Sequence, residues 1–428
     1  MKYKKIFILL LVSTLLANVD EYLSQIDAYV KDGKYQDATS LFNKTLIQYD
    51  ASAQLYYVGA QISIKIDDLD QANKHFLKAI ELDPKNEEYR IAQQKLSDLK
   101  DDLTRARKTF DSGLMDDAII EYEKLLTKYQ EHAIVFYNLG LIYKVTKEYT
   151  LAVEHYKRAR ALNPFEKKYS QAIKAIAQIA AKEGDEEFRR QEFDSAIEKY
   201  QNAIVYYPEY TTAIFKLART YYKLKDYENA IKYLDQGIAF DPQQEQSEKM
   251  LGDIYRRTGN IEIALFHYNQ AIKIKGDYYQ AFYSLGSLYL SESKLNDARD
   301  ALNNAILIKP TYSKAYGSLG TVEQELGNIN TAIQNYSKAV EYDKKAYDIH
   351  YRLASAYNIN RQYENARHSA KESLDIKRNY APAYFELGMA EKLLGNKIAA
   401  KDAFEKAKKD RNWRKSAQFE LDLLSKGF

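Results

Sequence analysis

The sequence predicts an all-α fold, a solenoid of stacked helix–turn–helix repeats that ends in a capping helix. Three observations carry this prediction. Apolar residues recur at helical spacing along nearly the whole chain, an alanine returns at a constant interval through its second half, and five of the six prolines occupy one place in that period. Because stacked repeats form one body, the 428 residues need not be divided into two or three globular domains.

The stretch 281–310 shows the repeating unit. Residues 282–290 and residues 298–306 each place apolar side chains at helical spacing, and a polar turn separates them. Gly286 and Ala298 lie on otherwise apolar helix faces. Since neither side chain has more than one carbon, we expect the two helices to pack closely as a hairpin.

Alanines equivalent to Ala298 mark eleven copies of this unit. The step between them is constant from Ala196 onward, and two earlier steps are longer, the one that ends at Ala118 and the one that ends at Ala196. The marker alanines are Ala38, Ala72, Ala118, Ala152, Ala196, Ala230, Ala264, Ala298, Ala332, Ala366 and Ala400. The place of Gly286 is held by glycine or alanine in every copy except the first, which has Ile26.

A helix–turn–helix unit of about 34 residues with Leu-Gly, Tyr, Ala, an aromatic residue, Ala and Pro in this order resembles the tetratricopeptide repeat. The resemblance covers roughly residues 19–414. It implies a right-handed superhelix, a right-handed α-solenoid, in which the first helices of the repeats line a concave groove that holds extended peptides. It implies binding of a protein or peptide.

The two long steps suggest how the chain is organised. The extra residues are helical in composition, so we expect the first helix of the third and fifth repeats to extend N-terminally by about three turns. These extensions are either ledges for a partner or tolerated insertions. We therefore expect N-terminal repeats over 18–176 with insertions at about 87–98 and 167–176, regular repeats over 177–414, and a capping helix at 415–428. In that last helix, Phe419 and Leu423 are expected to cover the core of the final repeat.

Residues 1–17 have the layout of a secretory signal peptide. Lys2, Lys4 and Lys5 precede an apolar run that is too short for the roughly 20 residues of a membrane-spanning helix. An uncleaved anchor or a first helix that caps the array are the alternatives. The chain has no cysteine, so disulfides and thiolate metal sites are excluded. Together these features favour export to the periplasm or envelope of a bacterium, with no stable membrane span after cleavage.

Composition does not indicate a nucleic-acid partner. The formal charge is +3, and removal of the three N-terminal lysines brings it to about zero. The six histidines form no metal-binding pattern, and no nucleophile elbow or glycine-rich phosphate loop is present. We therefore expect neither an enzyme nor a metal or cofactor site.

Basic residues gather in the first helices of three successive repeats. Arg189, Lys223 and Arg257 follow one another at the interval of the repeat, so stacking should align them as a ladder, which Asp185 and Asp253 interrupt without balancing. In a groove, this charge would favour an acidic segment or a C-terminal carboxylate. A solvated helix face is the alternative, since 63 of 428 residues are Lys or Arg. The basic residues are Lys182, Arg189, Lys216, Arg219, Lys223, Lys249, Arg256 and Arg257.

The next repeat changes the character of the expected groove. Tyr283, Ser284 and Ser287 would line it with uncharged groups that the packing pattern leaves free. The alternative is that small residues stand here only because the helices crowd. Three functions fit such a chain: an exported, non-catalytic scaffold that binds protein segments, for instance during assembly of an envelope complex; a repeat subunit that presents substrates to a separate enzyme such as a glycosyltransferase; or a self-assembling homo-oligomeric array.

Overall fold

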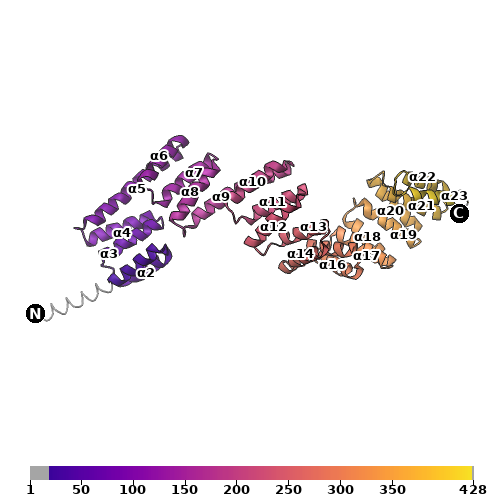
Figure 1. Ribbon diagram of the computed structural model, residues 1–428, viewed down its shortest axis with the longest axis horizontal. Helices are drawn as coiled ribbons and strands as arrows, with labels where there is room; N and C mark the ends of the chain where they lie inside the picture. Colours follow the sequence, from indigo (N-terminus) through magenta and orange to yellow (C-terminus); the bar gives the residue numbers. More distant parts are fainter. Residues whose placement is uncertain (1–18, 427–428) are drawn as a thin grey trace, which may run out of the picture. The chain divides into compact units, whose positions relative to one another are not determined.

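The computed structural model describes residues 19–426, and these residues form helices joined by short turns, with no strand among them (Figure 1). The chain divides into two compact units, Met1–Ala213 and Ile214–Phe428. The expected signal peptide at 1–17 lies outside the described residues. Within 19–426, no helix is both long and apolar enough to cross a membrane.

Helices alternate as the first and second members of hairpins. The first helices are α3 Ala53–Lys65, α5 Glu87–Asp111, α7 Ala133–Val145, α9 Lys167–Arg189, α11 Thr211–Leu224, α13 Glu245–Arg257, α15 Tyr279–Ser291, α17 Ser313–Glu325, α19 Tyr347–Ile359 and α21 Ala381–Leu393. The second helices are α2 Tyr35–Gln48, α4 Leu69–Leu82, α6 Met115–Lys128, α8 Tyr149–Leu162, α10 Phe193–Tyr206, α12 Tyr227–Phe240, α14 Ile261–Ile274, α16 Leu295–Ile308, α18 Ile329–Tyr342, α20 Tyr363–Ile376 and α22 Lys397–Ala407. Residues 19–31 are also helical and precede α2, and α23 Arg414–Ser425 ends the chain's helices.

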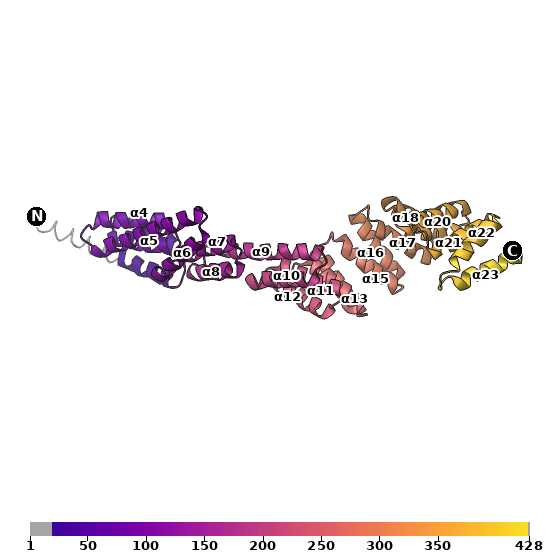
Figure 2. The same cartoon turned by 90° about the horizontal axis from the view of Figure 1, so that it is seen from above.

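Two first helices are much longer than the others. Helix α5 has 25 residues and α9 has 23, whereas α3 and α7 have 13. Asn86 caps the start of α5, where its Oδ1 accepts from the backbone N–H of Glu88 at 3.0 Å. Figures 1 and 2 show α5 running alongside α4 and on to α6. Each long step is therefore taken up by one continuous helix extended at its N-terminus, at the two places where the spacing predicts it.

Close approach of small residues holds together every hairpin after the first, which has Ile26 in place of glycine or alanine. All eleven marker alanines are 0 % exposed. A Cβ placed on Gly286 would lie 2.7 Å from Cγ of Leu302 and 3.2 Å from the carbonyl oxygen of Ala298. In other repeats the glycine faces an aromatic ring, and a Cβ on Gly252 would lie 2.6 Å from the ring of Tyr268. The predicted close-packed hairpin is confirmed.

The turn inside each hairpin contains a residue with left-handed backbone conformation. Within residues 19–426, every residue of positive φ stands at this one place of the repeat. Glycine fills five of the eleven positions, where its lack of a Cβ removes the steric cost. The positions are Gly33, Asp67, Gly113, Lys147, Gln191, Lys225, Gly259, Ser293, Gly327, Arg361 and Gly395. Sequence reasoning missed this position because polar residues other than glycine occupy six of the copies.

In the N-terminal unit, contacts also join repeats that are not neighbours. The turn between α8 and α9 reaches back to the turn between α3 and α4. Asn163 donates its Nδ2–H to Oδ2 of Asp67 at 3.1 Å, and the Tyr169 hydroxyl donates to the same oxygen. The ring of Phe165 packs edge-on against Tyr35 of α2, with centroids 5.9 Å apart. The turn between α8 and α9 and the start of α9 therefore pack against the first two repeats of the same unit.

Helix α23 covers the last repeat, as the sequence predicts, but with different residues. Ala417 and Leu421 are buried against a cluster that includes Phe404 of α22. Phe419 is 60 % exposed, so the expectation that it covers the core is wrong. It lies two residues after Ala417, and two residues turn a helix by about 200°, onto the opposite face.

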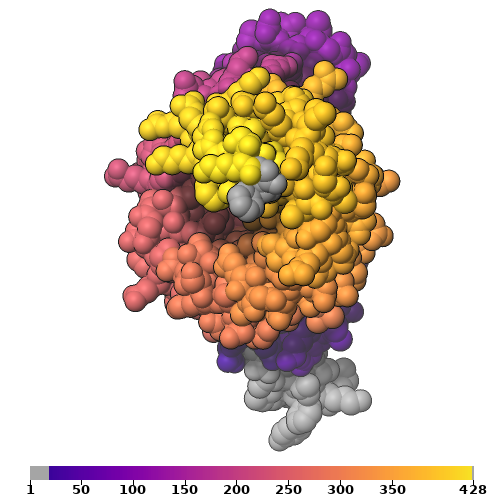
Figure 3. Space-filling view, turned by 90° about the vertical axis from the view of Figure 1, so that its right-hand side faces the viewer, coloured from indigo at the N-terminus to yellow at the C-terminus, as the bar shows by residue number. Residues whose placement is uncertain are grey.

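The C-terminal unit curves. Figure 3 shows its helices, from salmon through orange to yellow, winding around a hollow. First helices of neighbouring repeats contact one another, α13 with α15, α15 with α17, and α19 with α21. In a curved stack the elements on the inner side lie closer together, so the first helices form the inner layer.

Four glutamates among the described residues of the C-terminal unit are buried, and Glu386 is one of them. Glu386 of α21 is 8 % exposed. Asn358 of α19 donates its Nδ2–H to Oε2 of Glu386 at 2.8 Å and to the Glu386 backbone carbonyl at 3.0 Å. Burial raises the pKa of Glu386, and hydrogen bonds from Asn358 and Ser355 oppose that rise.

We predict that Ala298→Leu destabilises the C-terminal unit. The larger side chain must fit where the alanine is completely buried, and overpacking of this kind costs about 1–3 kcal/mol. Chemical denaturation followed by circular dichroism measures the loss. Leu307→Ala, on the exposed side of the same helix, is the control and should leave the curve unchanged. A parental curve for Ala298→Leu would show that this alanine is not a close-packing residue.

We predict that Glu386→Gln stabilises the protein at pH 7.5 but not at pH 4. The folded pKa lies above the unfolded value, so the stability that the protonated group contributes is lost as pH rises from the unfolded pKa through the folded one. Glutamine is neutral throughout and can still accept from Asn358. Melting temperatures of parent and variant across this pH range measure the difference. An equal effect at both pH values would contradict a raised pKa.

Candidate functional site

Two basic residues of the predicted ladder are exposed in the C-terminal unit. Lys223 lies in the last turn of α11, and Arg257 is the last residue of α13. Arg257 donates its Nε–H to the Tyr222 hydroxyl at 2.8 Å, and its guanidinium lies 5.6 Å from the centroid of that ring. This hydrogen bond raises the pKa of Arg257. Within residues 19–426, neither Lys223 nor Arg257 has a carboxylate at ion-pair distance.

Lys249 has its own counter-ion. Its Nζ lies 2.6 Å from Oδ2 of Asp253, one helical turn along α13, and Oδ1 of Asp253 accepts from the Tyr268 hydroxyl at 2.9 Å. Asp253 therefore pairs with one of the basic residues of the patch. An i, i+4 pair on a half-buried helix face neutralises this lysine.

The other predicted basic residues have different surroundings. Lys216, Arg219 and Arg256 are half-buried on the first helices of the C-terminal unit. Lys182 and Arg189 are exposed on α9 of the N-terminal unit, where Nε–H of Arg189 donates to the backbone carbonyl of Asp185 at 3.3 Å. Of the predicted basic residues in the C-terminal unit, Lys223 and Arg257 are thus the exposed ones.

The uncharged residues after the ladder are less accessible than expected. Ser284 is 7 % exposed, which differs from the expectation that packing leaves it free. The Ser287 hydroxyl is buried and has no hydrogen-bond partner within the described chain. Tyr283 is half-buried, and its ring meets that of Tyr312 edge-on at 5.2 Å.

Sequence reasoning missed two equivalent clusters of a lysine with three tyrosines. In the first, Lys309 donates its Nζ–H to the Tyr279 hydroxyl at 3.1 Å and lies 5.6 Å from the ring centroid of Tyr312. In the second, Lys377 donates to the Tyr347 hydroxyl at 3.2 Å. The clusters are two repeats apart, so a comparison of alternate repeats would have found them. Their members are Tyr279, Tyr283, Lys309 and Tyr312 in one, and Tyr347, Tyr351, Lys377 and Tyr380 in the other.

The N-terminal unit contains a cavity of about 490 Å³ that the sequence did not indicate. Its sides are α3, α4, the N-terminal extension of α5, and the turn between α6 and α7. Apolar or aromatic side chains make up most of its lining, together with an amide, two ammonium groups and an imidazole. The lining residues are Tyr57, Gln61, Ile64, Phe76, Ala92, Lys95, Leu96, Leu99, Lys128, Tyr129 and His132.

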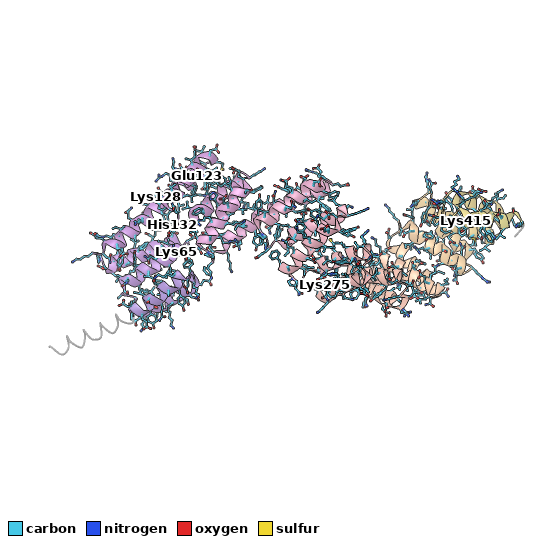
Figure 4. All side chains as sticks on the ribbon, in the orientation of Figure 1. Lys65, Glu123, Lys128, His132, Lys275 and Lys415 are labelled. Atoms are coloured by element: carbon cyan, nitrogen blue, oxygen red, sulfur yellow. The ribbon has the colours of Figure 1, made fainter. Side chains whose placement is uncertain are left out.

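The polar groups of this cavity differ in their partners. Lys128 lies 2.9 Å from Oδ2 of Asp102. Burial lowers the pKa of His132, and the Lys65 ammonium lowers it further, so the imidazole is neutral at pH 7. Figure 4 shows His132 between Lys128 and Lys65. Lys95 is exposed, and no carboxylate within residues 19–426 pairs with it.

Neither region has the groups that a catalytic metal would need. Across residues 19–426 there is no group of three or more histidine, aspartate or glutamate side chains that could hold a metal ion. The surface at Lys223 and Arg257 and the cavity of the N-terminal unit both place positive charge beside apolar or aromatic side chains. This combination suits the binding of a ligand that carries negative charge and apolar groups.

Several solved structures resemble parts of this chain. MamA is 23% identical over 38% of this chain and 89% of its own, with a TM-score of 0.36. The pilF protein of Pseudomonas aeruginosa is 16% identical over 49% of this chain and 97% of its own, with a TM-score of 0.45. The APC/C hetero-tetramer Cut9-Hcn1 gives 16% identity over 86% of this chain and 83% of that chain, with a TM-score of 0.44.

Family models match more than half of the chain. Models described as tetratricopeptide repeat match residues 53–86, 133–165, 181–245, 279–312, 347–380 and 381–409, and one described as TPR repeat matches 252–292 and 320–358. The matched segments are built from the helical hairpins described above, with their buried marker alanines. The chain therefore belongs to the tetratricopeptide repeat family.

Proposed function

We propose that this protein is an exported, non-catalytic scaffold that binds an acidic protein segment on the inner face of its C-terminal unit. The observation that carries the proposal is the pair Lys223 and Arg257, two exposed cations on successive first helices without a carboxylate partner in the described chain. Export is supported by the signal-peptide layout of residues 1–17.

The geometry around Arg257 suits recognition of an anion. Its side chain is held against Tyr222 by a hydrogen bond and by the ring face, so little rotational freedom remains to be lost on binding. A guanidinium presents further N–H donors in a planar fork that matches a carboxylate. Lys223, in the last turn of the preceding first helix, adds a second exposed positive charge.

The position of these residues supports a protein segment as the partner. First helices form the inner layer of the curved C-terminal unit, and members of the tetratricopeptide repeat family hold extended peptides on this layer. Tyrosine-rich surface continues beyond the two cations at Tyr283 and Tyr312, and aromatic side chains are favoured at protein interfaces. An acidic segment with apolar side chains would match both parts of this surface.

We predict that the double variant Lys223→Glu, Arg257→Glu weakens binding of a fluorescein-labelled peptide of alternating glutamate and leucine by roughly tenfold or more, because two attractions become repulsions. Fluorescence anisotropy measures the affinity, which should also fall as salt rises. The matched control is Lys232→Glu, Lys273→Glu, which makes the same charge change on exposed second-helix positions of the same repeats.

Helicity and melting temperature should be unchanged in both double variants, because all four side chains are exposed. If the two double variants lose affinity equally, the peptide senses only net charge, and a specific site at Lys223 and Arg257 is excluded. If neither loses affinity, the two residues belong to a solvated face.

A further inference from the structure

The cavity in the N-terminal unit forms because the N-terminal extension of α5 supplies one of its walls. Tyr57, Gln61 and Ile64 of α3 form one wall on the side that faces α5. Ala92 and Leu96, which form the opposite wall, belong to the part of α5 that precedes the regular repeat. A first helix as short as α3 or α7 would leave this wall out. The extension therefore adds a second wall, which turns a stretch of helix surface into a pocket.

Helices α7 and α9 correspond to α3 and α5. Between α7 and α9, side chains occupy the place that the cavity takes between α3 and α5. Tyr57 and Tyr89 correspond to Tyr137 and Tyr169, and the two ring pairs have centroid distances of 4.8 Å and 5.3 Å. At the place of Gln61, however, the second pair has Leu141. Tyr206 and Tyr207 stand at the places of Lys128 and Tyr129, and they pack against the core. An amide and an ammonium group have thus replaced core-filling side chains in the first pair only.

The chemistry of the lining selects one kind of ligand. The floor is apolar, with Phe76, Leu96 and Leu99 among its side chains, and a site of this kind favours an apolar group. At the rim stand Lys95 and Lys128, and no acidic residue lines the cavity. Lys128 forms an ion pair with Asp102, whereas Lys95 has no acidic partner in the described chain.

We propose that this pocket binds a free aliphatic carboxylic acid of medium chain length, with the chain on the apolar floor and the carboxylate at Lys95. A volume of about 490 Å³ lies within the range of small-molecule sites, roughly 300–1,000 Å³. The side-chain amide of Gln61 and the neutral ring of His132 are further hydrogen-bond donors in the lining. This site lies in the N-terminal unit, so it is independent of the peptide site proposed in the C-terminal unit.

Decanoate, kept below the concentration at which it forms micelles, is the probe. Titration calorimetry on the full chain should show saturable binding at one site, and the melting temperature should rise with decanoate concentration. Decylamine, which has the same chain and the opposite charge, should bind at least about tenfold more weakly. Equal binding of the acid and the amine would overturn the proposal, because the rim would then select no charge.

Two substitutions, each with a control on the same helix, test whether decanoate binds in this pocket. Ala92→Phe fills the cavity and should abolish decanoate binding, whereas Gln94→Phe adds the same ring to the exposed side of the same helix and should not. Lys95→Glu should weaken decanoate binding about tenfold, and Lys108→Glu, farther along α5, should leave it unchanged.

Lys95 and Lys108 are both exposed, so these two variants keep the test decisive even if Ala92→Phe disturbs folding. Parental decanoate affinity in Lys95→Glu would overturn the proposal. So would displacement of decanoate by a short peptide with a C-terminal leucine at lower concentration than decanoate itself requires, because the occupant would then be a chain end rather than a free acid.

Discussion

The stacking of the repeats depends on how closely the two helices of each hairpin can approach. A fully buried alanine on the second helix and a glycine or alanine on the first allow that approach, and a Cβ on Gly286 would already lie 3.2 Å from the Ala298 carbonyl oxygen. Close hairpins stack with little variation, because a larger residue at either place would change the angle of every repeat that follows. The inner layer of first helices, and with it the placement of Lys223 and Arg257, is a consequence of that spacing.

Much of this fold could be predicted from the period of the sequence alone. Marker alanines and helical spacing give the hairpins, and the two long steps give the extended helices α5 and α9. It was harder to predict which face of a helix is buried and which backbone conformation a turn residue adopts. Phe419 looks like a core residue by its chemistry, but the face of α23 is set by Ala417 and Leu421. The left-handed turn position was missed because local backbone geometry can be imposed on Lys147 or Gln191 by the two helices that they join.

The candidate sites divide in the same way. Periodicity placed Lys223 and Arg257 on successive first helices, α11 and α13, where the structure has them. The pairing of Lys249 with Asp253 needed attention to side chains four apart on one helix. The two lysine–tyrosine clusters lie two repeats apart, so a search restricted to steps of a single repeat could not find them. No pattern could reveal the cavity, since it depends on which surface of α3 the extension of α5 comes to face.

Contacts between distant repeats give the N-terminal unit a different route to its folded state. A repeat stack whose members touch only their neighbours can nucleate anywhere and grow one unit at a time. Asp67 and its hydrogen-bond partner Tyr169 are 102 positions apart in the chain, so this contact forms only after most of the unit has been synthesised. Such long loops raise contact order and slow folding. The N-terminal unit should therefore fold and unfold as a single cooperative block, while the C-terminal unit can lose its repeats from the end inward.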